Sequence, residues 1–379
     1  MSQITCARVG YGTVARLHEQ KLSESGVKTV AVIDTDSQKK QQAEQAGFLV
    51  LPSCAEAAPL RPGFWDICVN TSQHFNVIQQ ILQVDPQANI LVEKPVCLLA
   101  EIPSLTTTIV NFGGKIVVNE NYASSKITGI VQEIAFRKLG LRPSKIVVEF
   151  TKNRQLDSIG GRFIDYDLGV LGYEGPHMLA IVAQLGEELQ IDQIIDSRII
   201  EPSTPLHCQG ETCARNQGSA FVRCRSKTGV EVELYTCMAG IVQYRYPLFS
   251  IENIPIEDTL TRYRLVALTG TDPAGDEYTI VGFFEPLPNF HRSQGAVITL
   301  KNQVIVGVLA PVEDDCMGVH LQRAVDYFTG TGENPYSLAM ALHNTILLHR
   351  LAGRATLLSP LCQDGAEPVD VETKSLLWT

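Results

Sequence analysis

A lysine directly after a short apolar segment is the first candidate for chemistry. Residues 89–92 have the composition of a strand buried on both faces, and Glu93, Lys94 and Pro95 follow at once. In an open α/β sheet, ligands bind beyond the carboxyl ends of the strands, which is where Lys94 would lie. Pro95 fixes its own φ angle and restricts Lys94 to an extended conformation. Lys94 is therefore either a placed catalytic residue or a surface lysine at the start of a helix.

The first strand of the chain leads into a glycine-rich turn. Residues 4–9 predict a strand, residues 10–15 read Gly-Tyr-Gly-Thr-Val-Ala, and residues 15–22 have a helical pattern. Here Gly10 permits a tight turn, Gly12 lets the backbone approach a pyrophosphate, and Ala15 keeps the helix close to the sheet. The free N–H groups of the helix would bind that pyrophosphate. We therefore expect cofactor contacts from Gly10, Tyr11, Gly12, Thr13, Val14 and Ala15.

An acid ends the second predicted strand, residues 28–33. This acid, Asp34, lies 24 residues beyond Gly10. A carboxylate at that point accepts both hydroxyls of an adenosine ribose and repels a 2′-phosphate. Asp36 adds negative charge and no arginine follows closely, so NAD is favoured over NADP as the cofactor. The alternative role of Asp34 is to cap the helix expected over residues 38–46, which Ser37 would do equally well.

Strands and helices continue to alternate over the first third of the chain. Further strands are expected at residues 48–51, 66–69 and 115–118, and helices at residues 75–84, 98–110 and 125–138. Polar residues at 70–74 would line the cofactor cleft at the end of their strand. We add Asn70, Thr71, His74, Glu93, Lys94 and Asn121 to the expected cofactor contacts. For His74, packing on the loop at the start of a helix is an equally good explanation.

From residue 144 the pattern changes to strands that follow strands. Strands are expected at residues 146–150, 193–200, 219–226, 230–239, 262–269, 277–282 and 297–300, and helices at residues 178–185, 319–328 and 337–351. This order predicts a mostly antiparallel open sheet in an α+β domain. The fold class is thus α/β, with a Rossmann doubly wound parallel sheet at residues 1–122 and an α+β substrate-binding and oligomerisation domain at residues 123–336. A helix at 337–354 would pack back on the first domain, before a tail at 355–379.

Composition excludes several classes of partner. The chain has 379 residues, of which 45% are hydrophobic and 19% charged, as in a soluble globular protein. A net charge of −10 argues against nucleic-acid and anionic-membrane partners. No apolar run reaches the roughly 18 residues that span a bilayer, and the N-terminus lacks the features of a signal peptide. We expect a cytoplasmic protein that forms a homodimer or homotetramer through its C-terminal sheet, because the strands there are not polar enough for a fully wetted face.

Ten cysteines are scattered along the chain, and one pair lies beside a histidine. His207, Cys208 and Cys213 are the only such cluster. Structural zinc normally requires four ligands in paired short spacings, and no second pair lies nearby. We therefore expect a surface loop there and no metal site.

Together these motifs resemble the glucose–fructose oxidoreductase / inositol dehydrogenase (Gfo/Idh/MocA) family. The resemblance extends from residue 4 to about residue 354 and rests on Gly10-x-Gly12-x-x-Ala15, Asp34, Glu93-Lys94-Pro95, Asn121-Tyr122 and His177. It implies an NAD(P)-dependent dehydrogenase or reductase that acts on a CH–OH group of a sugar, cyclitol or related small molecule. It also implies that Lys94 and His177 lie at the reacting carbon. A histidine suits the general base, and a lysine can stabilise the developing alkoxide.

The chain departs from the family pattern beside the histidine. The family usually has an aspartate four residues before it, where this chain has Tyr173, and the nearest acid is Glu174. We expect either Tyr173 or Glu174 to take the place of that aspartate as a catalytic residue. Ala123 and Ala180 also replace an arginine and an acid that are common in the family. The expected substrate contacts are Lys94, Tyr122, Lys152, Arg154, Arg162, Tyr173 and His177.

These departures leave two functions open. The first is the oxidoreductase just described, and the second is a non-catalytic regulatory protein of the same fold that binds the dinucleotide without turnover. Lys94 and His177 favour the enzyme, because a sensor needs neither residue. Without the family resemblance, His177 could also be a residue that starts a helix after Pro176.

Overall fold

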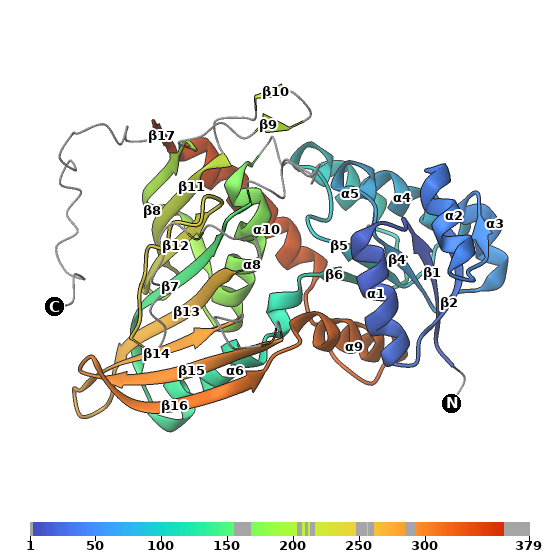
Figure 1. The fold of residues 1–379 in the computed structure, drawn as a ribbon. Coiled ribbons are helices and arrows are strands. Elements are labelled where there is room, and N and C mark those ends of the chain that lie inside the picture. Colours follow the sequence, from blue (N-terminus) through green and yellow to red (C-terminus); the bar gives the residue numbers. More distant parts are fainter. Residues whose placement is uncertain are drawn as a thin grey trace.

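Two β-sheets with helices packed against them make up the computed structural model (Figure 1). It describes residues 3–154, 168–202, 207–208, 211–212, 217–247, 256, 261–284, 291 and 293–359. Arg162, one of the expected substrate contacts, lies outside these residues. The smaller sheet comes from the N-terminal part of the chain and the larger one from the C-terminal part, as predicted.

The N-terminal sheet has six parallel strands in the order β3-β2-β1-β4-β5-β6, the doubly wound order. The strands are β1 (Thr5–Val9), β2 (Lys28–Ile33), β3 (Val50–Leu51), β4 (Phe64–Ile67), β5 (Ile90–Glu93) and β6 (Ile116–Asn119). The helices between them are α1 (Thr13–Glu24), α2 (Ser37–Gln45), α3 (Cys54–Ala57), α4 (Thr71–Val84) and α5 (Ile102–Thr108). Alternate residues of β5 are buried on opposite faces, which is why this segment reads as continuously apolar.

Two helices from the end of the chain help to cover this sheet. On one face, α3, α4 and α5 pack together with α10 (Leu338–Arg354), which contributes Ala341 to the same core as Val92 and Val118. On the other face, α1 packs with α9 (Cys316–Thr329), whose Phe328 stacks on Phe64. The sequence places α9 in the second domain, yet it packs on the first. The domain boundary at residue 122 stays a prediction.

The C-terminal sheet has nine strands in the order β16-β15-β14-β13-β7-β12-β11-β8-β17. They are β7 (Arg142–Lys152), β8 (Leu189–Ile200), β11 (Ser219–Ser226), β12 (Glu231–Cys237), β13 (Arg262–Thr271), β14 (Glu277–Phe283), β15 (Gln294–Lys301), β16 (Val304–Glu313) and β17 (Thr356–Leu358). Only β7–β12 and β8–β17 pair in parallel among these strands. Helices α6 (Lys126–Gln132) and α8 (Val170–Gln184) pack on one face.

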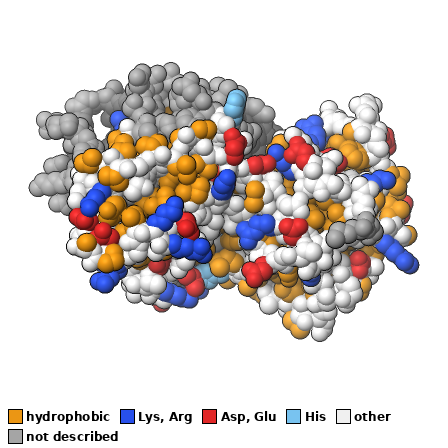
Figure 2. Space-filling view, turned by 90° about the horizontal axis from the view of Figure 1, so that it is seen from below, with side chains coloured by type: hydrophobic (Ala, Val, Ile, Leu, Met, Phe, Trp, Pro, Cys, Tyr) orange, Lys and Arg blue, Asp and Glu red, His pale blue; other side chains and the backbone are white. Residues whose placement is uncertain are grey.

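Strand β16 is absent from the sequence prediction and forms an exposed edge. Its Val304, Val306 and Val308 are 66%, 57% and 54% exposed. Figure 2 shows hydrophobic side chains gathered on the side of the C-terminal domain seen from below, where β15 and β16 lie in Figure 1. The strand does not alternate between buried and exposed residues, so the usual signal of a half-buried strand is missing.

Helix α8 begins eight residues earlier than the sequence predicts. It starts at Val170 rather than at Met178, so that Tyr173, Glu174 and His177 all lie within it. Glycines and Pro176 interrupt the sequence pattern, and the helix is buried almost all round, which removes the amphipathic period. A Cβ atom on Gly175 would lie 2.5 Å from Leu348, so the glycine allows α8 and α10 to approach closely. The prediction that His177 lies in front of a helix was therefore wrong.

The segment around His207 contains a short hairpin of β9 (His207–Cys208) and β10 (Glu211–Thr212). Cys213 lies outside the described residues, so the surface-loop prediction stays open for the cluster as a whole. Elsewhere in the described chain, seven cysteines are free thiols and six of these are buried. None of the described helices is both long and apolar enough to cross a membrane.

Candidate active site

Lys94 lies at the carboxyl edge of the N-terminal sheet and reaches the second half of the molecule. It follows β5 directly, and its Nζ atom donates a hydrogen bond to the carbonyl oxygen of Tyr173, at 3.0 Å. Tyr173 is one helical turn before His177 on α8, so the ammonium group and the imidazole lie along the same stretch of helix. Lys94 thus contacts the helix that carries His177, the other residue that the sequence singled out for chemistry.

The acidic partner of His177 is Glu120. Nδ1 of His177 lies 2.5 Å from Oε1 of Glu120, and the glutamate is only 1% exposed. The imidazole also packs on the ring of Tyr122, with ring centroids 4.9 Å apart. A carboxylate facing Nδ1 accepts a hydrogen bond from the N–H group of that nitrogen, which leaves the Nε2 lone pair available to a ligand. This is the arrangement of a histidine that acts as a general base.

Glu120 was not among the expected site residues. It directly follows β6, in the Asn119-Glu120-Asn121-Tyr122 segment, so its position at a strand exit was the signal that could have identified it. The turn is held by α9, because His320 contacts the carbonyl oxygen of Val118 and the hydroxyl of Ser124, both at 3.0 Å. Burial lowers the pKa of His320 to about 4, so this ring is neutral at ordinary pH.

Glu174, which with Tyr173 was expected to replace the usual aspartate, is paired with arginines, and its catalytic role stays a prediction. Glu174 is 4% exposed and forms ion pairs with Arg154 and Arg264, the latter through contacts of 2.9 and 3.0 Å. Burial would raise the pKa of this carboxyl, but Arg264 and Arg154 hold it well below its usual value. Glu174 therefore joins α8 to β13 and to the segment that follows β7. Tyr173 contacts Lys94 through its carbonyl oxygen, which any residue would provide.

Three expected substrate contacts are buried against the C-terminal sheet. Tyr122 is 4% exposed and its hydroxyl accepts a hydrogen bond from Arg264 at 2.7 Å. Arg154 is paired with Glu174, and Lys152 is buried at the end of β7. Their roles as direct substrate contacts therefore stay predictions. Tyr122 instead supports the ring of His177.

The glycine turn has the geometry of a dinucleotide site. Gly10 has φ +94° and its missing Cβ would lie 2.7 Å from the carbonyl oxygen of Cys68, so only glycine fits. Gly12 caps α1, and a Cβ there would meet no protein atom within 4 Å. That open space in front of the free N–H groups of α1 is where a pyrophosphate would bind. Ala15 is buried against the sheet as expected, whereas Thr13 and Val14 are exposed.

Asp34 lies beside this turn and is preorganised by the backbone. Its two carboxylate oxygens accept hydrogen bonds from the N–H groups of Tyr11 (2.7 Å) and Asp36 (2.9 Å). Each oxygen keeps a second lone pair for a ribose hydroxyl. The side chain of Tyr11 is buried against Phe48, so only its backbone is available at the cofactor site. The cap of α2 is Asp36, not Asp34 or Ser37.

The other expected cofactor contacts divide into two groups. Asn70 is exposed and Thr71 lines a cavity, whereas the Oδ1 atom of Asn121 is buried without a hydrogen-bond partner, as an acceptor waiting for a ligand would be. His74, by contrast, is 1% exposed and contacts the carbonyl oxygens of Pro95 (2.7 Å) and Val69 (3.0 Å). The prediction that His74 contacts the cofactor was wrong, because His74 instead fixes the loop after β5. Glu93 contacts His18 and Asn119.

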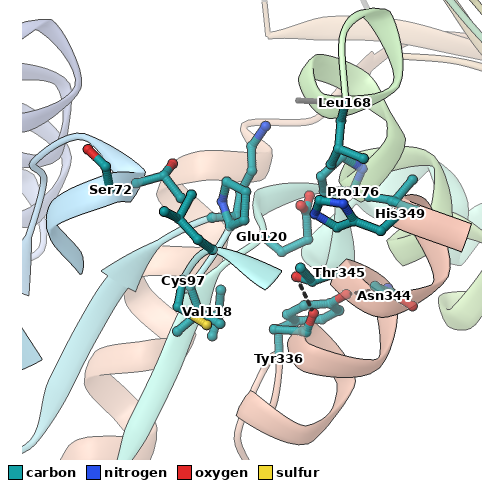
Figure 3. A pocket seen from close by; sticks show the side chains of 17 residues that line it. Ser72, Cys97, Val118, Glu120, Leu168, Pro176, Tyr336, Asn344, Thr345 and His349 are labelled. Carbon is teal, nitrogen blue, oxygen red and sulfur yellow. Dashed lines mark hydrogen bonds between the residues drawn. The ribbon is translucent and has the colours of Figure 1, made fainter. Parts of the chain in front are cut away.

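A cavity of about 250 Å³ lies between this edge and α10 (Figure 3). Lys94 and Glu120 contribute to one wall, and Pro176 precedes His177 on another. Much of the remaining lining is apolar, with Val96, Cys97, Val118, Leu168 and Leu348. Polar groups of α10 complete it: Asn344, which donates to Tyr336 at 2.6 Å, Thr345 and His349. The cavity can hold a small molecule next to the ammonium and carboxylate groups.

Comparison with protein families identifies the N-terminal part. Residues 4–119 match the model named GFO_IDH_MocA, described as an oxidoreductase family with an NAD-binding Rossmann fold. These residues include the glycine turn, Asp34 and Lys94. A search of curated proteins finds no match to the chain.

Solved structures share the fold over nearly the whole chain. UDP-N-acetylglucosamine 3-dehydrogenase GnnA from Acidithiobacillus ferrooxidans is 14% identical with a TM-score of 0.64, over 94% of this chain and 97% of that one. An oxidoreductase from Agrobacterium radiobacter, in complex with NAD+, L-tartaric acid and magnesium, is 15% identical with a TM-score of 0.65, over 93% and 97%. GenD2 from gentamicin A biosynthesis, in complex with NAD, is 14% identical with a TM-score of 0.62, over 94% and 93%.

Proposed function

We propose that the chain is a member of the Gfo/Idh/MocA oxidoreductase family, whose NAD-binding Rossmann model matches residues 4–119, and that it interconverts a secondary alcohol and a ketone on a sugar, cyclitol or related small molecule. The contact between His177 and Glu120 carries this proposal. A buried carboxylate that orients an imidazole beside a lysine is an arrangement for proton transfer, and binding alone requires no such dyad. The names of two structural neighbours, a UDP-sugar dehydrogenase and an oxidoreductase bound to L-tartaric acid, support a polyol-like substrate.

The residues of the glycine turn fit the dinucleotide that the fold implies. The open space at Gly12, the Asp34 carboxylate and the unpaired Oδ1 of Asn121 would hold its pyrophosphate, ribose and carboxamide. We propose NAD over NADP, because Asp34 would repel a 2′-phosphate. When bound, the nicotinamide supplies the hydride acceptor or donor of the reaction.

The protein then supplies orientation and proton transfer. Nδ1–H of His177 donates a hydrogen bond to Glu120, so that Nε2 takes the hydroxyl proton of the substrate during oxidation and returns it during reduction. Lys94 donates a hydrogen bond to the same oxygen and stabilises negative charge that develops on it. Its bond to the Tyr173 carbonyl aims the ammonium group while two of its three N–H donors remain for the substrate.

A spectrophotometric assay tests this function. We expect reduced nicotinamide to form when the purified protein is mixed with NAD and one member of a panel of polyols, hexoses, inositols and UDP-N-acetylglucosamine. Parallel reactions with NADP report the cofactor preference, and calorimetry reports NAD affinity. Clear NAD binding without turnover on any substrate, in either direction, would overturn the enzyme and favour the dinucleotide-sensing regulatory protein.

We also propose that the chain forms a homodimer or homotetramer through its C-terminal sheet. Support comes from β16, an edge strand with unpaired backbone groups on one side and exposed valines. An exposed apolar edge of this kind normally pairs with a partner, because alone it promotes aggregation. A second copy of the chain is the partner that closed symmetry provides.

A further inference from the structure

A cluster of ionisable side chains lies beneath the candidate active site, and the proposed chemistry does not use it. His18 of α1 is 0% exposed, as are Arg8 of β1 and Asp66 of β4. Nδ1 of His18 lies 2.9 Å from Oδ1 of Asp66, and Nε2 lies 2.9 Å from Oε1 of Glu93. Nε of Arg8 donates to the other oxygen of Asp66 at 2.8 Å. One imidazole therefore connects two carboxylates inside the sheet.

This geometry determines the charge of the imidazole. A neutral ring has one N–H donor and one lone pair, so one of its nitrogens would face a carboxylate lone pair. Only the imidazolium form can donate to both acids. Burial opposes this charge, but hydrogen-bonding contacts with Cys68 and Asp66, together with the negative charge of Asp66, raise the pKa of His18 well above its usual value. Burial would raise the pKa values of Asp66 and Glu93, yet hydrogen bonds and charge from His18 leave both lowered.

The other charged and titratable groups around His18 fit this assignment. Arg8 on β1 balances Asp66 and is in turn paired with Glu19 of α1. The Cys68 thiol lies 3.4 Å from both Nδ1 of His18 and Oδ1 of Asp66, and burial raises its pKa to about 12, so it is protonated. Strand β6 contributes the uncharged Asn119, whose Nδ2 lies 2.8 Å from Nε2 of His18. In the imidazolium form this amide donates to Glu93 and not to Nε2. Helix α9, packed on α1, carries His320, which is neutral as described above.

A metal ion bound to this cluster is the alternative to a protonated His18. Ligand atoms of His18, Asp66 and Cys68 lie within 4.8 Å of one another, which suits a metal. However, a metal would require the lone pair of His18 Nδ1 and would lie next to the Arg8 guanidinium, which already occupies Asp66. Like charges at such close range in a buried site are costly, so the hydrogen-bonded cation is the better occupant.

The position of His18 connects the two parts of the candidate site. It is located on α1, whose N-terminus faces the expected pyrophosphate, and it binds the side chain of the residue directly before Lys94. Building on the proposed function, we propose that His18 is a permanent buried imidazolium that positions Glu93, and through it the Lys94 turn, relative to the cofactor-binding helix. Asn119 donates to the same Glu93 oxygen from β6 and completes the support.

Nitrogen NMR of histidine-labelled protein tests the charge without any activity. The His18 signals are assigned by their loss in His18→Gln. We expect both ring nitrogens of His18 to remain protonated from about pH 6 to pH 9, whereas an ordinary histidine titrates near 6.5. A neutral or titrating His18 overturns the proposal. So does stoichiometric zinc in the purified protein, measured by mass spectrometry after growth with added zinc and compared with His18→Gln.

A pH profile of activity tests the positioning role. Asp66→Asn keeps the shape of the residue but removes one carboxylate, so the pKa of His18 should fall. We expect this variant to gain a new decrease of kcat/KM with rising pH, absent from the wild type, while NAD affinity is retained. Glu19→Gln, which contacts Arg8 and not His18, is the matched control and should show the wild-type profile. If Asp66→Asn lowers the thermal stability but leaves the pH profile of kcat/KM unchanged, the cluster has only a structural role.

Failure of this inference can be separated from failure of the proposed function. If no substrate turns over, the NMR experiment still reports the charge of His18. If turnover occurs, His18→Gln should lower kcat about tenfold or more, because small misplacement of a catalytic group is costly. An unchanged kcat in that variant would contradict the positioning role alone.

Discussion

Nδ1 of His177 and Oε1 of Glu120 lie 2.5 Å apart, although the residues are 57 positions apart and come from α8 and from the exit of β6. The Rossmann sheet thus provides the carboxylate and the second half of the molecule provides the imidazole. Formation of the dyad depends on the docking of the two halves. We propose that Glu120 takes the role that the sequence predicted for Tyr173 or Glu174.

The first prediction concerns Glu120. Glu120→Gln should lower kcat about 100-fold or more, because it removes the acceptor that sets the tautomer of His177. Glu120→Asp, which retains the acid, should recover part of the activity. NAD affinity, measured by calorimetry, should stay unchanged in both variants. The exposed Glu56→Gln is the control, and near-normal turnover in Glu120→Gln would remove the dyad from the mechanism.

We expect Glu174, unlike Glu120, to contribute mainly to the free energy of unfolding. Glu174→Gln leaves Arg154 and Arg264 without their buried carboxylate, and the free energy of unfolding should fall by about 3–5 kcal/mol. Thermal and denaturant unfolding measure this change. The exposed Glu188→Gln, which loses surface pairs with Lys227 and His343, should change stability by less than about 1 kcal/mol. Equal effects of the two substitutions would contradict the buried ion-pair assignment.

Acid titration gives a second measurement on Glu174. Its pKa in the folded state is below the unfolded value, so the unfolded state binds the proton more readily as the pH falls. The stabilisation is complete above the unfolded pKa of about 4.3 and is lost as the pH decreases through the folded pKa. Unfolding experiments should show a steeper loss of stability below this pH in the wild type than in Glu174→Gln. Parallel curves would refute the ion-pair contribution.

Asp34 should determine the affinity for NAD and the preference over NADP. Asp34→Ala removes the acceptor for the ribose hydroxyls and should weaken NAD binding by about 1.5–3 kcal/mol, roughly 10- to 100-fold. NADP binding should weaken less or improve, because the repulsion of a 2′-phosphate is removed. Asp36→Ala, which loses only the cap of α2, should retain the preference. A selectivity unchanged by Asp34→Ala would remove its role in ribose recognition.

Much of the fold follows from the sequence, because its signals are local. The parallel sheet is recognisable since β5 and its neighbours are buried on both faces, and the Gly10 turn has a conformation that only glycine adopts easily. Lys94 and His177 were found because motifs of neighbouring residues mark them. The start of α8 was missed because a helix buried all round has no amphipathic period.

The parts of the site that the sequence did not predict depend on contacts between distant residues. Glu120 follows a strand and could have been a candidate, but its contact with α8 requires the packing of both domains. Tyr122, Lys152 and Arg154 suit substrate contacts by residue type, and only the tertiary structure shows them to be buried. The edge strand β16 has no alternation of buried and exposed residues from which to predict it.

Self-association should depend on β16. Replacing Val306 and Val308 with lysine puts charges on an exposed apolar edge, so the double variant should be monomeric while the wild type is a dimer or tetramer. Light scattering coupled to size exclusion measures the mass. Leu49→Lys, at a side chain 52% exposed on the Rossmann domain, is the control and should leave the mass unchanged. A monomeric wild type, or an oligomer retained in the double variant, would contradict this interface.

The central claim is that Lys94 and His177 act on the reacting carbon. Single-turnover formation of reduced nicotinamide, with the best substrate of the panel, measures this step directly in Lys94→Ala and His177→Gln. Both variants should bind NAD with nearly wild-type affinity and lose about 10²- to 10⁴-fold in the rate of the chemical step. His343→Gln, a half-exposed histidine of α10, should react at the wild-type rate. An undiminished rate in His177→Gln would contradict its assignment as the base.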